Sequence, residues 1–114
     1  MKHVSLAVAV AILFASGATA QEPGSVTKGA ELARSVCAHC HAVGSGQRRS
    51  PNPMAPSFAT LATTPGMTGT ALRVWLRSSH PTMPDYILSD HDRDDVVAYI
   101  LSLNRRTPKR SPTL

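Results

Sequence analysis

The sequence predicts a small all-α domain. Three segments place apolar or small residues at helical spacing, and no segment shows the apolar–polar alternation of a half-buried strand. The chain has 114 residues, of which 42% are hydrophobic and 17% are charged. This composition is typical of one globular domain and excludes a disordered chain, and the length leaves no room for a TIM barrel or two Rossmann halves.

Serine and threonine residues mark where the expected helices begin. Ser25 or Thr27 can cap the first helix, and Thr68 can cap the third. Ser89 and Asp92 resemble a capping box before the last helix, whose aspartate-rich first turn is expected to be solvated. The expected helices run from Val26 to about His39, from Ser57 to Ala62, from Thr68 to about Ser78, and from the Ser89 cap to Leu103.

Two proline-containing segments, 42–56 and 79–88, are expected to be irregular because they combine turn residues with a lack of apolar periodicity. The third helix is expected to face inward through Leu72, Trp75 and Leu76, which share one face at helical spacing. The fold prediction is therefore a bundle of three main helices and short helical turns, joined by long loops.

The first twenty residues have the features of a secretory signal peptide. A short basic start at Lys2 precedes an apolar run over residues 4–15, and residues 18–20 (Ala-Thr-Ala) form a small-x-small cleavage pattern. The apolar run has 12 residues, whereas a helix that spans a bilayer needs about 20. We therefore expect cleavage after Ala20 and a mature, periplasmic chain over residues 21–114.

The formal net charge of +5 comes from twelve Lys and Arg against seven Asp and Glu. Such a surplus can indicate a nucleic-acid or membrane partner. Residues 21–104, however, carry seven charges of each sign, and four of the basic residues lie in residues 105–114. We therefore expect a neutral domain followed by a basic, mobile C-terminal tail, and no nucleic-acid partner.

A C-x-x-C-H motif spans residues 37–41 and is formed by Cys37, Cys40 and His41. It is the signature of covalent c-type haem attachment. Two thiols three positions apart, near the end of a helix, can reach the two vinyl groups at one edge of a porphyrin. His41 is then carried under the iron and supplies an axial imidazole. The signal peptide agrees with this interpretation, because such haem is attached outside the cytoplasm.

Other uses of the cysteines fit the sequence less well. A thioredoxin-like C-x-x-C requires a βαβ frame, which the pattern does not contain. A zinc site that adds His80 to the motif would have an unusual spacing, and a disulfide between Cys37 and Cys40 would leave the adjacent His41 unexplained. Aromatic residues make up only 4% of the chain, so the core is thin, and a covalently held haem would fill it.

The sixth iron ligand is expected to be Met83. It lies between Pro81 and Pro84 in the loop before the last helix, and proline limits the conformations that such a loop can adopt. Paired histidine and methionine ligands are an established arrangement of haem iron. His80, three residues earlier in the same loop, is the competing ligand.

The remaining methionines and histidines are expected to have other positions. Met54 lies in the loop after the motif and is expected near the proximal side. Met67 is expected to form a hydrophobic staple with Leu72 around the cap of the third helix. His39 occupies an x position of the motif and should point outward, and His91 lies in a first helical turn and should be solvated.

Together these segments resemble a class I (mitochondrial-type) cytochrome c of the small bacterial periplasmic kind with one haem. The resemblance covers nearly all of the domain over residues 21–104, and its specific elements are the C-x-x-C-H motif and the Met83-Pro84 pair. It implies the cytochrome c fold, in which three main helices and short helical turns pack around one covalently bound haem.

Some residue roles are implied by the resemblance alone. Gly29 would let the first helix cross the last one closely, near Val96 and Tyr99, because glycine has no Cβ. The carbonyl of Pro56 would accept a hydrogen bond from Nδ1 of His41 and thereby orient the imidazole.

The resemblance leaves more than one residue as a contact of the haem propionates. Trp75 resembles a tryptophan that contacts a propionate, and ordinary core packing is the equal alternative. The segment over residues 44–53 departs from the family pattern, so Arg48 and Arg49 could bind a propionate or face water.

With His41 and Met83 both bound to iron, no open position remains for a substrate. The predicted function is therefore a soluble one-electron Fe(III)/Fe(II) carrier and not an enzyme. The expected partners are periplasmic redox proteins, membrane oxidoreductases among them, which a monomer without a retained membrane anchor meets through small transient interfaces. Three alternatives stay open: a haem enzyme or gas-binding protein with a free sixth position, a haem subunit of a larger oxidoreductase, and a haem-less structural or metal-binding domain.

Overall fold

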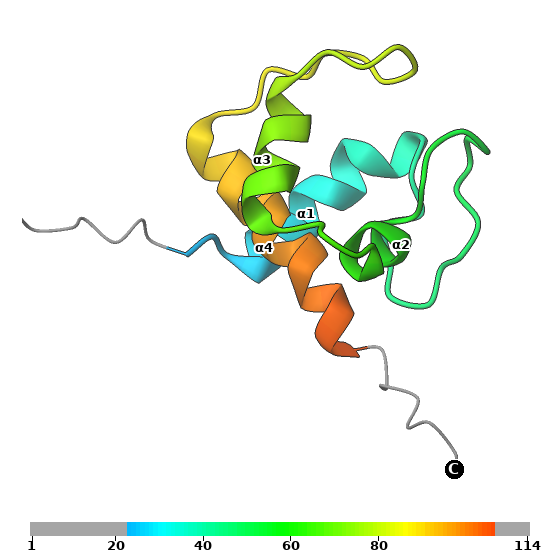
Figure 1. The fold of residues 1–114 in the computed structure, drawn as a ribbon, viewed down its shortest axis with the longest axis horizontal. Coiled ribbons are helices and arrows are strands. Elements are labelled where there is room, and N and C mark those ends of the chain that lie inside the picture. The colour runs from blue at the N-terminus through cyan, green and yellow to red at the C-terminus, as the bar shows by residue number, and fades with distance from the viewer. Residues whose placement is uncertain (1–22, 107–114) are drawn as a thin grey trace, which may run out of the picture.

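The computed structural model describes residues 23–106, and over this range the chain forms four α-helices and one 3₁₀ helix without a strand (Figure 1). The expected all-α class is confirmed. The predicted signal peptide and the predicted tail beyond Arg106 lie outside the described residues. The elements are α1 (Val26–Ser35), η1 (Cys37–His39), α2 (Phe58–Thr63), α3 (Gly69–Arg77) and α4 (Asp90–Arg106).

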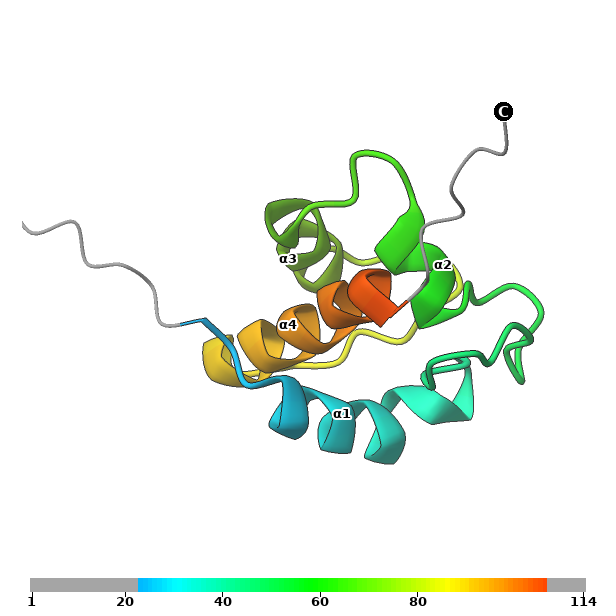
Figure 2. The same cartoon turned by 90° about the horizontal axis from the view of Figure 1, so that it is seen from below.

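The C-terminal helix α4 is the helix that α1, α2 and α3 all contact. Figure 2 shows α1 along one side of α4 and α2 and α3 on the other. Because α4 is covered from two sides, its buried surface is wider than the single predicted stripe and includes Val97. The helix also continues through Arg105 and Arg106, two residues beyond the expected end of the domain. The predicted stripe is buried in full, namely Val96, Tyr99, Ile100 and Leu103.

α1 and α3 begin after the predicted caps Ser25 and Thr68, and Ser57, expected inside the second helix, caps α2 instead. The side-chain oxygens of Ser25, Ser57 and Thr68 accept backbone N–H groups three residues later, at 3.1 to 3.3 Å. Before α4, the hydroxyl of Ser89 accepts the amide of Asp92 at 3.1 Å and donates to its carboxylate at 2.8 Å. In a full capping box the carboxylate would reach the serine amide instead. The Asp92 carboxylate pairs with the hydroxyl because its side chain is short.

The first helix ends earlier than expected. α1 stops at Ser35, and residues up to His39 continue as the tighter helix η1. At the change, the amide of Val36 is shared between the carbonyls of Leu32 and Ala33, an arrangement common where an α-helix tightens into a 3₁₀ turn. Apolar periodicity could not predict this end, because both helix types repeat every three to four residues.

The aspartates that open α4 are paired and not merely solvated, which corrects the sequence expectation. Nε of Arg73 donates to Asp94 at 2.6 Å, and Arg77 donates to Asp90 at 2.8 Å. Both arginines and both aspartates are four residues apart, so each pair shares one face of its helix. The equal spacing of the arginines in α3 and the aspartates in α4 is the signal that could have predicted two ion pairs between these helices.

The backbones of α1 and α4 approach each other closely at Gly29. A Cβ placed on Gly29 would lie 1.9 Å from the carbonyl oxygen of Asp95 and 2.8 Å from Cβ of Tyr99. Beside this crossing, the amide of Ser25 donates to the carboxylate of Asp95 at 2.6 Å. The close crossing implied by the resemblance is therefore confirmed, and the nearest atom is the Asp95 carbonyl oxygen rather than an atom of Val96.

We predict that Gly29→Ala destabilises the protein by about 2–3 kcal/mol, because the new methyl group would meet backbone that cannot move aside. In an open helix the same change would stabilise by about 1 kcal/mol. Gly69→Ala is the matched control, since its Cβ would first meet the flexible tip of Arg73 at 3.2 Å. Urea unfolding of both variants checks the prediction, and a Gly29→Ala protein as stable as the wild type would contradict it.

Candidate haem site

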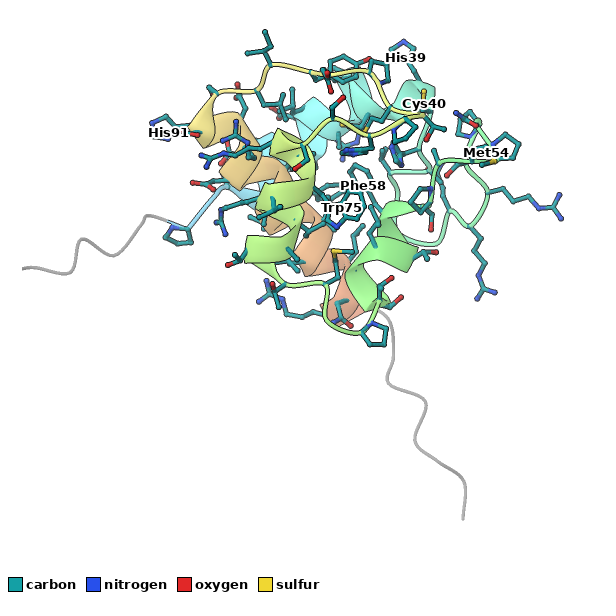
Figure 3. The ribbon with its side chains drawn as sticks, turned by 45° about the horizontal axis from the view of Figure 1, so that its top comes forward. His39, Cys40, Met54, Phe58, Trp75 and His91 are labelled. Carbon is teal, nitrogen blue, oxygen red and sulfur yellow. The ribbon has the colours of Figure 1, made fainter. Side chains whose placement is uncertain are left out.

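A largely apolar cavity of about 470 Å³ opens between the helices. Its walls come from η1, α2, α3 and α4 and from the two long loops, and its volume is typical of cofactor sites, about 300–1,000 Å³. Figure 3 shows Phe58 and Trp75 directed toward the middle of the molecule from α2 and α3. The cavity brings together all of the sequence-predicted site residues, which are Cys37, Cys40, His41, Pro56, Trp75 and Met83.

The C-x-x-C-H motif forms one wall of this cavity. The amides of Cys40 and His41 both donate to the carbonyl of Cys37, at 3.1 and 2.9 Å. This tight turn places two thiols and one imidazole along the same cavity wall. Burial raises the pKa of the Cys37 thiol above its ordinary value.

Neither the disulfide nor the zinc site is formed among the described residues. Cys37 and Cys40 are not joined in a disulfide. Within residues 23–106, no group of three or more His, Cys, Asp or Glu side chains lies close enough together to hold a metal ion. The structure therefore does not assemble the zinc site that would combine the motif with His80.

The ring of His41 is held by a hydrogen bond to the loop that precedes α2. Its Nδ1 lies 2.7 Å from the carbonyl oxygen of Pro56, which is the pair that the resemblance implies. A carbonyl oxygen can only accept, so Nδ1 carries the proton and the Nε2 lone pair is available to a metal. The ring also packs against Phe58, with centroids 5.5 Å apart. The carbonyl of Pro56 and the ring of Phe58 thus orient the imidazole.

A second hydrogen bond, which sequence reasoning missed, holds the segment just after the motif. The buried hydroxyl of Tyr99 donates to the carbonyl of Val43 at 2.6 Å, and the Tyr99 ring packs against Phe58 with centroids 6.3 Å apart. This bond ties the chain that follows His41 to α4. The signal was a tyrosine on the predicted buried stripe, because a buried phenol normally requires a hydrogen-bond partner.

Met83 lies in a tight turn of the loop between α3 and α4. Its amide donates to the carbonyl of His80 at 3.2 Å, and Pro81 occupies the turn position whose φ a proline presets. The side chains of Met83 and His80 both line the cavity. Trp75 packs edge-on against His80, with ring centroids 5.1 Å apart. Both candidate sulfur and nitrogen ligands therefore reach the same cavity.

The expected inward face of α3 needs correction at Trp75. Leu72 is buried, but Trp75 is 54% exposed and lies at the mouth of the cavity. Leu72 is the buried residue of α3, and Trp75, almost one turn later, borders the cavity and not the core. Arg48 and Arg49 are exposed and do not line the cavity, so of the residues discussed as propionate contacts, Trp75 alone borders it.

The structure places the remaining methionines at the cavity and the two remaining described histidines at the surface. Met67 packs against the core and, like Leu72, lines the cavity. Met54 lines the cavity as well and is 72% exposed. His39 and His91 are exposed and point away from the molecule, as Figure 3 shows.

The residues of the cavity fit a haem. The apolar walls suit a porphyrin, two thiols three positions apart suit its vinyl groups, and a neutral imidazole with its Nδ1 proton engaged suits the iron. A thioether from the second loop completes the donor set. These features define a site for a covalently attached haem and, with the helical fold, the class of c-type cytochromes.

Comparison with known proteins leads to the same class. The family described as "Cytochrome C oxidase, cbb3-type, subunit III" matches residues 24–100. Cytochrome c-552 of Bradyrhizobium diazoefficiens is 38% identical over 103 residues, which cover 90% of this chain and 94% of that protein. No solved structure shows a significant match. The chain therefore belongs to this cytochrome c family, as a small cytochrome with one haem.

Membership of the family implies a covalently bound haem c with its iron and a role in haem-based electron transfer. Cytochromes of this kind are typically extracytoplasmic. Over residues 23–106, none of the helices combines the length and the hydropathy needed to cross a bilayer.

We predict that Tyr99→Phe lowers the free energy of unfolding by about 1–2 kcal/mol, because it leaves the buried carbonyl of Val43 without its donor. Tyr86→Phe is the control, since Tyr86 is half exposed and water can replace any partner of its hydroxyl. Thermal or urea unfolding measures both changes. Equal stability of the two variants would show that the buried hydrogen bond contributes nothing.

Proposed function

We propose that this protein is a periplasmic one-electron carrier whose haem is attached through Cys37 and Cys40 and whose iron is bound by His41 and Met83. When bound, the haem supplies a one-electron Fe(III)/Fe(II) couple. The observation that carries the proposal is that two thiols, an oriented imidazole and a thioether all line one apolar cavity.

The protein side chains have distinct tasks in this proposal. The carbonyl of Pro56 keeps the proton of His41 on Nδ1, which leaves Nε2 for the iron and makes it a better donor. Bound to the iron, the thioether of Met83 would exclude outside ligands from the sixth position and would favour the reduced state. Apolar walls, such as those formed by Phe58 and Ile100, exclude water and raise the potential further.

The compartment and the partners follow from the same proposal. The signal peptide predicted over residues 1–20 and the typical location of the family support the periplasm. The partners are then redox proteins of that compartment, including membrane oxidoreductases, which the carrier meets transiently.

A role as the haem subunit of a larger oxidoreductase is the second candidate, because the matched family is described as a subunit of a cbb3-type oxidase. The cytochrome c-552 relative favours a separate carrier, since its match with this chain covers 94% of that protein. Sedimentation of native extracts prepared with mild detergent distinguishes the two. Haem that sediments with a small monomer supports the carrier, and haem that sediments with a large complex supports the subunit.

We predict that Met83→Ala abolishes the methionine-to-iron charge-transfer band of the ferric protein, lowers its midpoint potential, and lets the ferrous protein bind carbon monoxide. Met54→Ala is the matched control, because Met54 also lines the cavity but lies 72% exposed; it should keep the band. Visible spectra and redox titration measure these changes. A band that survives in Met83→Ala would exclude Met83 as the ligand, and loss of the low-spin spectrum in His80→Ala would assign the position to His80.

We predict that Cys37→Ser with Cys40→Ser yields protein without covalent haem, because no thiol remains to bond the vinyl groups. The wild-type protein, made with the haem-attachment machinery present, should carry one haem and begin at Gln21. Intact mass measurement reports both features. A wild-type mass without haem would refute the proposed function, and a retained N-terminus would refute the predicted cleavage.

A further inference from the structure

The loop that carries Met83 is held at its two ends by a cluster of three charged residues. We call residues 78–89 the methionine loop, and Arg77, Asp90 and Arg93 the clasp. Arg77 ends α3 and Asp90 begins α4, so these two residues flank the methionine loop. Arg77 donates to Oδ1 of Asp90 at 2.8 Å, and Arg93 donates to the same oxygen. One carboxylate therefore joins both ends of the loop.

Arg93 is the buried member of the clasp. It is only 9% exposed, and its second terminal nitrogen donates to the carbonyl of Leu88, inside the methionine loop, at 2.9 Å. Its Nε has no hydrogen-bond partner. Burying a guanidinium is costly unless its charge is paired and hydrogen-bonded. Here the burial is compensated by Asp90 and by a main-chain carbonyl of the methionine loop.

The clasp matters because the methionine loop has little apolar packing of its own. Ile87 is fully exposed and Tyr86 nearly half exposed. A second hollow of about 400 Å³ shares Trp75, His80 and Met83 with the haem cavity and extends to Arg77 and Arg93. Because most of its residues are exposed, the methionine loop gains little from packing against the helices, and its hydrogen bonds help to decide where it stays.

We propose that Arg93 is a positioning residue for Met83: by holding Leu88 and Asp90 together, it sets the fraction of molecules in which the methionine loop is closed over the sixth iron position. This inference rests on the proposed function, because it assumes that Met83 binds iron. The chemical consequence is control over which ligands bind the iron. Imidazole or carbon monoxide can reach the iron only when Met83 dissociates from it.

The structure offers a matched control on the same two helices. Arg73 pairs with Asp94 at 2.6 Å and joins α3 to α4. Neither of these residues belongs to the methionine loop, whereas Arg93 donates to the carbonyl of Leu88 within it. Arg73→Gln should therefore destabilise the fold without freeing Met83, whereas Arg93→Gln should do both.

The experiment titrates imidazole into the ferric holoprotein of the wild type, Arg93→Gln and Arg73→Gln, followed by visible spectroscopy. Imidazole binds after Met83 dissociates, so its apparent affinity scales with the open fraction of the methionine loop. We expect Arg93→Gln to raise this affinity about tenfold, equivalent to about 1.4 kcal/mol. The imidazole affinity of Arg73→Gln should stay within about twofold of the wild-type affinity, even if its unfolding midpoint falls as far as that of Arg93→Gln.

A similar rise in both variants would mean general loss of stability and would overturn the proposal, as would unchanged affinity in Arg93→Gln. If Arg93→Gln does not fold, the Asp90→Asn variant tests the proposal instead. The Asp90 side chain is 75% exposed, so this change should be tolerated, and it keeps Arg93 in the chain. A smaller rise in Asp90→Asn supports the clasp, and no rise overturns it. A wild-type protein without the methionine-to-iron band would instead refute the proposed function, whereas an intact band with unresponsive variants refutes this inference alone.

Discussion

The contact between the backbones of α1 and α4 at Gly29 is the constraint on which the site depends. α1 leads directly into the C-x-x-C-H motif, so the depth at which α1 lies against α4 sets how far the two thiols and the imidazole stand from the buried face of α4. That face supplies Val96 and Ile100 to the cavity. A side chain at the crossing would separate the helices and move the motif away from this wall.

The two side chains proposed as iron ligands are held in different ways. His41 is fixed by a main-chain carbonyl and by Phe58, and the segment after it is fixed by the buried hydroxyl of Tyr99. Met83 lies in a turn whose flanking residues are mostly exposed. The segment around His41 is thus anchored to the hydrophobic core, whereas the turn that carries Met83 depends on a few polar contacts.

Local features of this fold could be predicted from sequence, because local chemistry determines them. The caps at Ser25 and Thr68 and the buried stripe of α4 follow from hydrogen bonding and periodicity within a few residues. The cysteine spacing identified one wall of the site for the same reason. The pairing of His41 with Pro56 needed a family resemblance, since the two residues are 15 positions apart.

What sequence reasoning missed depends on how the helices pack. The ion pairs between α3 and α4, the bond from Tyr99 to Val43 and the exposure of Trp75 are all decided by which faces meet. Helix propensity, which describes single residues, does not say which helix faces meet. The end of α1 at Ser35 was missed because the tightening into η1 changes the hydrogen bonding without changing the apolar pattern.

The position of Trp75 has a practical consequence. It is the only tryptophan of the chain, and it stands at the mouth of the cavity, in contact with His80 of the methionine loop. A porphyrin in that cavity would quench the indole emission by energy transfer. The fluorescence of Trp75 should therefore report on the distance between the helix and the prosthetic group: it should be weak while the porphyrin is near and should increase when the polypeptide unfolds around it.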